Sequence, residues 1–454
     1  MKKTMLMVMA LFIAMGVWAQ SKESKNVPEV DVTQAKRFAP LKVSEKATTE
    51  FIPLETNADF LLDGVAGNLI NVTENYIVTV NHMEGRLFVF SRQGKALHTF
   101  CRKGEGPEEF IYPRAVRVDE KAKEIFVLDY KRVQVYSLDG KYKRSLNIPE
   151  NVSIGSMFNY DDKHLICYDN HNLDRQGEKV AEQPFFLFSK KDGKIARIPL
   201  TIQNRIGQSM YIERDGKKMV VTMNNIAPMV KNGDEVVLSD MGSDVMYMYK
   251  KGKVTPLLKR NPGTMDFNPR SALGVVMKLG DIVWLREVKK EVKGPRPDIN
   301  MLTYDVATGE VNNLVLWDDV NFTNPYSVQS RNEHQELPYN CTSTCFQPDY
   351  LKKMNEQGRL KGRLKELAEE MLDDDKHHSG VSGQKGQKLL QGFQSPCRCA
   401  DSHDAGGLCL MSVLFLGFLI AHPVPHSDLC GIDSSFSLKL LNSINTILSL
   451  LGQK

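Results

Sequence analysis

Short apolar strands that end in a tight polar turn recur along the chain. One copy reads Val133-Gln134-Val135-Tyr136 and continues into the turn Asp139-Gly140-Lys141. Alternating side chains place one set on a buried face, and the turn glycine supplies the positive φ that a tight hairpin needs. The pattern therefore predicts repeated β-hairpins. Their turn glycines are Gly94, Gly140, Gly193, Gly252 and Gly309, about fifty residues apart, a period typical of propeller repeats.

A further apolar stretch precedes each hairpin, so the repeating unit holds about four short strands. These stretches are 76–80, 124–128, 164–168, 235–238 and 281–285. One such sheet cannot bury both of its faces alone, whereas radial packing of several sheets buries them and protects the strand edges. Five copies, with room for another after residue 318, predict an all-β fold, a six-bladed β-propeller over residues 48–349. A β-sandwich with coincidental hairpins is the alternative.

The second repeat is the most specific. It contains Gly104-Glu105-Gly106-Pro107-Glu108-Glu109-Phe110, followed by Val133 to Tyr136 and Asp139-Gly140-Lys141. This segment resembles an NHL-type propeller repeat. With Ile52 to Thr56 and the loop Arg102 to Phe110, the chain from 48 to 375 resembles the six-bladed β-propeller proteins of Bacteroides and its relatives. The resemblance implies fold and export rather than an activity. Thr49 to Leu54 is expected to complete the last blade.

The N-terminus is typical of a secretory signal peptide. Lys2 and Lys3 precede an apolar run from Met5 to Trp18, and cleavage is expected after Ala19. Residues 1–19 are therefore predicted to be removed, and residues 20–47 to form an N-terminal segment ahead of the propeller. Without a cysteine at the cleavage point, we expect a periplasmic, cell-surface or secreted product that carries no lipid and no membrane span.

The pattern changes after residue 349. Residues 350–375 have apolar positions at helical spacing, which predicts one amphipathic helix belonging to the last blade. Residues 376–454 form an atypical, irregular tail without the blade repeat. Three interpretations stay open for it: a disordered or frame-shifted segment replacing the closing strand, a membrane-attached C-terminus, or a zinc site. The candidate zinc ligands are Cys397, Cys399, Cys409, His422, His426 and Cys430.

The composition and charge of the chain give little information about its function. The formal charge of +4 is spread along the chain, which does not favour nucleic-acid binding, and no catalytic motif or cofactor motif is present. We expect a monomeric binding or scaffold module for a protein, peptide or glycan, with no metal and no cofactor. The alternative is a metal-dependent lyase or hydrolase like some NHL propellers. Arg102 and Lys103 are the predicted ligand-binding residues.

Other candidate groups have structural interpretations that we favour over chemical ones. The histidines at strand ends and the paired carboxylates suit turns and solvent-exposed positions, and a bridge between Cys341 and Cys345 is left open because its loop would be small. The histidines and carboxylates in question are His82, His98, His164, His171, Asp161, Asp162, Asp318 and Asp319.

Overall fold

The computed structural model describes residues 27–378, with short gaps, and residues 409–415. The predicted signal peptide and most of the tail, including all but one of the candidate zinc ligands, lie outside the described residues. The gaps are 34–37, 58, 61, 63–69, 176–177, 208, 215–216, 223–225, 269, 290–298, 325, 329–334 and 347.

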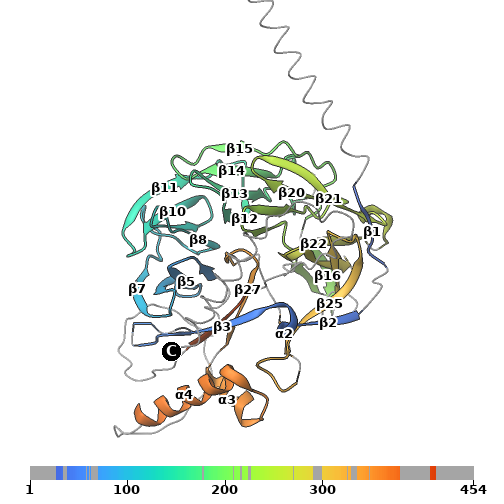
Figure 1. Cartoon of the computed structure of the whole chain (residues 1–454). Coiled ribbons are helices and arrows are strands. Elements are labelled where there is room, and N and C mark those ends of the chain that lie inside the picture. Colours follow the sequence, from blue (N-terminus) through green and yellow to red (C-terminus); the bar gives the residue numbers. More distant parts are fainter. Residues whose placement is uncertain are drawn as a thin grey trace, which may run out of the picture. The chain divides into compact units, whose positions relative to one another are not determined.

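The fold is all-β and propeller-like, as the hairpin pattern predicts. Consecutive four-stranded antiparallel sheets follow one another along the chain, and Figure 1 shows them around a common centre with β8, β12 and β22 on the inner side. Sheet 1 contains β4 (Ile70–Val72), β5 (Tyr76–Asn81), β6 (Arg86–Ser91) and β7 (Ala96–Cys101). Sheet 2 contains β8 (Ala115–Asp119), β9 (Glu124–Leu128), β10 (Arg132–Ser137) and β11 (Tyr142–Asn147). Sheet 3 contains β12 (Ile154–Asn159), β13 (His164–Asp169), β14 (Phe185–Ser189) and β15 (Ile195–Arg197).

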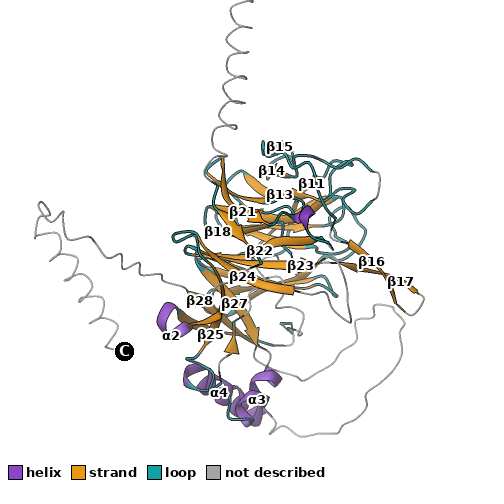
Figure 2. Cartoon of the chain, turned by 90° about the vertical axis from the view of Figure 1, so that its right-hand side faces the viewer, coloured by secondary structure: helices purple, strands orange, loops and turns teal. Residues whose placement is uncertain are grey.

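Two further sheets repeat this arrangement after an extra hairpin, which projects from the sheets in Figure 2. The hairpin is β16 (Ser209–Arg214) and β17 (Lys217–Thr222). Sheet 4 contains β18 (Met229–Asn232), β19 (Glu235–Leu238), β20 (Val245–Lys250) and β21 (Lys253–Asn261). Sheet 5 contains β22 (Ser271–Leu279), β23 (Ile282–Lys289), β24 (Ile299–Asp305) and β25 (Val311–Asp318), with the short β26 (Tyr326–Ser327) on β25. The 3-10 helix η3 (Thr264–Asp266) precedes sheet 5.

All five turn glycines of the sequence pattern have positive φ, between +72° and +87°. Each lies between the third and fourth strands of its sheet, so the predicted hairpins are confirmed. Gly94 is the most constrained, because a Cβ there would lie 1.9 Å from the carbonyl oxygen of Pro53. Its glycine is therefore required both by the turn and by the close approach of a neighbouring strand.

Neighbouring sheets share apolar cores. Val78 and Leu87 of sheet 1, for example, belong to one buried cluster with Val116 and Ile125 of sheet 2. The first strands β8 and β22 are buried along their whole length, whereas the fourth strand β7 is exposed or half-buried. Each fully buried aliphatic side chain contributes about 1.5–3 kcal/mol, so packing between sheets stabilises the ring of strands.

Sheet 6 joins the two ends of the described chain. It contains β27 (Cys341–Phe346), β28 (Cys409–Phe415) and β3 (Thr48–Leu54), in the order β27-β28-β3. The N-terminal strand therefore completes a sheet made by C-terminal strands, as expected. Residues 409–415, within the tail for which no strand was expected, form its middle strand.

The N-terminal segment also extends two other sheets. β1 (Glu29–Asp31) pairs in parallel with β21, and β2 (Phe38–Lys42) pairs in parallel with β25. A one-turn helix, α2 (Val43–Lys46), leads from β2 toward β3, and the Ser44 hydroxyl donates to Asp319 (2.6 Å). We call β1, β2, α2 and β3 the N-terminal strap. It covers the outer edges of sheets 4 and 5 before it enters sheet 6.

The prediction of one continuous amphipathic helix over 350–375 is wrong, because the segment forms two helices. They are α3 (Pro348–Glu356) and α4 (Gly362–His378). The break follows from Gly358, whose φ of +63° is incompatible with a continuous right-handed helix. The predicted apolar face is buried, since Leu351, Met354 and Leu364 pack with Phe346 of β27.

Candidate functional site

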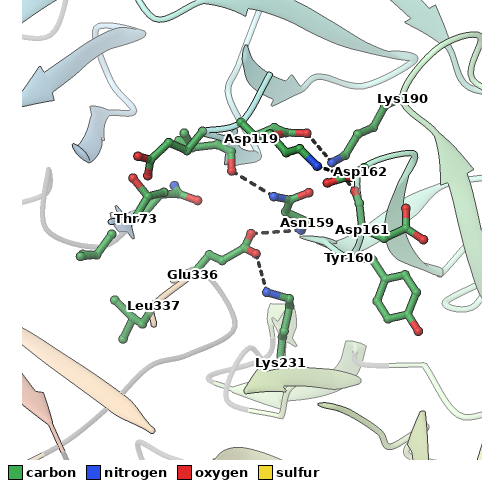
Figure 3. A pocket seen from close by; sticks show the side chains of 15 residues that line it. Thr73, Asp119, Asn159, Tyr160, Asp161, Asp162, Lys190, Lys231, Glu336 and Leu337 are labelled. Carbon is green, nitrogen blue, oxygen red and sulfur yellow. Dashed lines mark hydrogen bonds and ion pairs between the residues drawn. The ribbon is translucent and has the colours of Figure 1, made fainter. Parts of the chain in front are cut away.

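A cavity of about 340 Å³ lies where the first strands of several sheets end. Most of its wall comes from the last residues of β4, β8 and β12 and the turns after them, together with Lys190, Lys231 and Glu336 (Figure 3). Most of the lining residues are polar. Its residues are Asn71, Val72, Thr73, Val118, Asp119, Glu120, Lys121, Asn159, Tyr160, Asp161, Asp162, Lys190, Lys231, Glu336 and Leu337.

Glu336 connects four sheets at this cavity. Its backbone pairs with β4 of sheet 1, through Val72 N–H to its oxygen (2.8 Å) and its own N–H to Ile70 (3.0 Å). Its carboxylate accepts the Asn159 backbone N–H of sheet 3 (3.0 Å) and lies 2.9 Å from Lys231 Nζ of sheet 4. Arg117 of sheet 2 is the fourth contact, at 3.5 Å. Figure 3 shows the carboxylate between Asn159 and Lys231.

Arg117 supplies a fully buried positive charge behind Glu336. Its side chain donates to the carbonyl oxygens of Met157 (2.5 Å) and Val116 (2.7 Å) and lies over the ring of Phe158. Burial lowers the pKa of Arg117 to about 10, and the neighbouring Glu336 carboxylate opposes this shift. Arg117 therefore stays charged at neutral pH, and Glu336 is the carboxylate that balances it.

The lysines of the lining are each paired with a carboxylate. Lys190 is buried and donates to Asp119 (2.6 Å) and to the backbone oxygen of Asp161 (2.5 Å). Lys121, on the exposed rim, lies 2.5 Å from Asp162. Lys231 contacts Glu336, which it shares with Arg117, so each lysine at this wall has a carboxylate partner.

Two carboxylates of the lining have no lysine or arginine partner among the described residues, although the His164 ring lies 3.0 Å from Asp161. Glu120 accepts from the side chain and backbone N–H of Asn75. Burial alone would raise the pKa of Glu120, but hydrogen bonds from Thr73 and Asn75 outweigh it and hold the pKa below its usual value. Asp161 accepts the backbone N–H groups of Lys163 and His164. Both carboxylates are therefore charged at neutral pH.

Two amides on the wall are oriented by the strand between them. The side-chain nitrogens of Asn71 and Asn159 donate to Val116 (2.9 Å) and Val118 (3.1 Å) of β8. Reversing either amide would place its oxygen against a carbonyl oxygen, so these contacts fix the orientation. The Oδ1 atom of each amide is buried and has no hydrogen-bond partner among the described residues.

The predicted ligand-binding residues lie elsewhere. Arg102 donates to the backbone oxygen of Gly140 (3.3 and 3.2 Å), and Lys103 to that of Met83 (2.7 Å). Both are in the loop that precedes β8, whereas the cavity is at the end of β8. Neither residue lines the cavity, and their role in ligand binding stays a prediction.

The motif that contains them has a structural role. Side chains of β10 bind the backbone oxygens of this loop: Arg132 binds Gly106 (2.9 Å), Gln134 binds Pro107 (3.0 Å) and Tyr136 binds Glu108 (2.8 Å). The glycine- and proline-containing loop is therefore held rigidly against its own sheet.

The remaining candidates follow their structural interpretations. His82 stacks on Tyr112 and His164 contacts Asp161 within a turn, and the described residues contain no group of three metal-ligating side chains. Cys341 and Cys345 are both free thiols on one strand. Asp161 and Asp162 occupy a turn as expected, but they also line the cavity, which the sequence did not reveal.

Comparison with known proteins assigns the chain to a protein family. Residues 27–275 match the family described as a domain of unknown function, DUF4934, which is more than half of the chain. The chain belongs to this family. A search of curated proteins finds no match. No helix among the described residues has the length and apolar character needed to cross a membrane.

Several solved structures are similar to this DUF4934 protein, all at low sequence identity. A Bacteroides fragilis protein named for its expected export is 14% identical, with 83% of this chain and 99% of that chain covered and a TM-score of 0.49. A member of the DUF4221 family from Bacteroides vulgatus is 9% identical over 59% of this chain and 86% of that one, with a TM-score of 0.35. A catalytically inactive virginiamycin B lyase from Staphylococcus aureus is 10% identical over 63% and 97%, with a TM-score of 0.29.

Proposed function

We propose that this DUF4934 protein is an exported six-bladed β-propeller, with sheets 1–6 as NHL-like blades, that binds a ligand in the cavity at the ends of β4, β8 and β12. Its place of action is the periplasm or cell surface. The observation that carries the proposal is Glu336, whose carboxylate contacts the side chains of Arg117 in sheet 2 and Lys231 in sheet 4 and the backbone N–H of Asn159 in sheet 3.

The size of the cavity restricts the ligand. Small-molecule sites occupy roughly 300–1,000 Å³, and this cavity is near the lower end. It suits the end of a peptide or one to two sugar units rather than a folded domain. A protein partner would then be bound through an exposed chain end or an attached glycan.

Peptide and glycan arrays test this proposal on the full chain. Lys121→Met and Asp162→Asn alter the exposed rim of the cavity, where an ion pair contributes about 0–1 kcal/mol to stability. We expect them to change array binding while the matched variants Arg102→Ala and Lys103→Ala, at the other end of β8, leave it unchanged. The reverse result would transfer the site to the Arg102 loop and refute the cavity.

The alternative function is that of a metal-dependent lyase or hydrolase. It requires a stoichiometric divalent ion in the purified protein, which elemental analysis measures directly. A bound ion that is lost when cavity carboxylates are replaced would favour the enzyme over the binding module.

A further inference from the structure

We propose that the cavity selects ligands through a protonated primary amine, as carried by a peptide N-terminus or an amino sugar. This inference rests on the proposed function, because it names the chemical class that the same cavity accepts. It follows from the charges of the wall, from its unpartnered acceptor atoms and from its size.

The charges of the lining leave an excess of negative groups. Five carboxylates and three lysines line the cavity, and each lysine is held by one of the carboxylates. The remaining two, Glu120 and Asp161, have no lysine or arginine partner in the described part of the chain, and Asp161 contacts the ring of His164 at 3.0 Å. An entering anion would meet both of these charges and would have to break an existing lysine pair to find a cation.

The amides of the wall act in the same direction. Asn71 is 1% exposed, and both it and Asn159 use their N–H groups on β8, which leaves their oxygens without a donor. A buried acceptor without a partner costs about 1–3 kcal/mol. A donor group that reaches either buried oxygen relieves that cost, whereas an acceptor group cannot.

A primary ammonium group meets these requirements together. It carries one positive charge and three donors, and it has no acceptor. The two free carboxylates balance its charge, and the wall supplies acceptor oxygens. The cavity volume of about 340 Å³ fits the first residues of a peptide or a single amino sugar, and these two sources share the same ammonium chemistry.

Calorimetry with paired probes on the full chain tests the proposal and separates the sources. The probes are trialanine and N-acetyl-trialanine, and glucosamine and N-acetylglucosamine. Acetylation removes the charge and two of the three donors. We expect at least one free amine to bind about tenfold or more tightly than its acetylated partner. The α-amino group of a peptide has a pKa of about 8, so trialanine binding should weaken as the pH rises from 7 to 9.

Substitutions connect the effect to the cavity. Glu120→Gln keeps an acceptor for Asn75 but removes a free charge, and it should weaken binding of the amine about tenfold. The matched variant Glu108→Gln changes an exposed carboxylate of the rigid loop before β8 and should leave binding unchanged.

The outcomes separate this inference from the proposed function. Equal binding of free and acetylated probes overturns amine selection, as does an array ligand that lacks an amine and still responds to Lys121→Met. Either result retains the cavity as the binding site. If neither the four probes nor any array ligand responds to the cavity substitutions, the proposed site and the amine selection both fail.

Discussion

Glu336→Gln tests whether the wall of the cavity is held together by one carboxylate. The substitution keeps the shape of the side chain and an oxygen that can accept the Asn159 N–H, but it removes the negative charge. Arg117, which is fully buried, and Lys231, whose side chain is 16% exposed, would then lie near each other without a counter-charge. We expect a loss of stability of about 2–3 kcal/mol.

The magnitude follows from the contact geometry. Two unit charges 2.9 Å apart, as in the Glu336–Lys231 pair, attract by about 6 kcal/mol at an effective dielectric constant of about 20. The cost of removing both groups from water cancels much of this attraction. Breaking a buried pair by altering one partner typically costs about 3–5 kcal/mol, and the 13% exposure of the Glu336 side chain lowers our expectation to or slightly below the bottom of that range.

Urea unfolding at pH 7, followed by circular dichroism, measures the effect as a lower midpoint at an unchanged slope. The control is Glu366→Gln on α4, where an exposed ion pair with Arg363 should contribute at most about 0.5 kcal/mol. The double variant Arg117→Met with Glu336→Gln should lose less stability than the sum of the single variants. A Glu336→Gln protein as stable as the Glu366→Gln control would refute the reasoning.

Two further predictions concern the strands and their turns. Gly94→Ala should lower the free energy of unfolding by about 3 kcal/mol, because left-handed strain of about 1–2 kcal/mol is added to the clash with Pro53. Gly309 has a similar φ but open space around it, so Gly309→Ala should cost only the backbone strain of about 1 kcal/mol. If urea unfolding shows the same loss of stability for both variants, the contact with Pro53 does not have this role. Burial alone would raise the pKa of Glu124, but hydrogen bonds from Arg144 and Lys143 outweigh it and hold the pKa below the ordinary 4.5. Its contribution to stability is therefore complete above pH 4.5 and is lost as the pH falls through the folded-state pKa. Glu124→Gln should be destabilised at pH 6 and progressively less so toward pH 3, and a pH-independent difference would contradict the assignment.

The sequence predicted the hairpins correctly because a hairpin turn is determined by a few neighbouring residues. A glycine within a short polar turn sets the backbone conformation wherever it occurs, and the five turn glycines have the positive φ that this requires. The break between α3 and α4 was also visible in principle, since Gly358 lies within the predicted helix. The helical spacing of the leucines favoured one helix, because periodicity indicates the buried face and not the continuity of the helix.

The cavity could not be predicted in the same way. Glu336 is 177 residues from Asn159 and 105 from Lys231, and no spacing in the sequence records that these positions meet. Each of them is an ordinary polar residue next to a strand. Arg102 and Lys103 were predicted because they would place positive charge in a loop near the centre of the propeller, and in the structure they donate to the backbone oxygens of Gly140 and Met83.

The N-terminal strap has a consequence for the order of folding. Glu29 contacts Lys259, which is 230 residues later, and Ser44 contacts Asp319, which is 275 residues later. The residues of the strap are therefore synthesised long before their partners, and such distant contacts slow folding. Until then, the outer edges of β21 and β25 stay open to pairing with other chains. Assembly of this protein can finish only when its beginning and its later strands are available together.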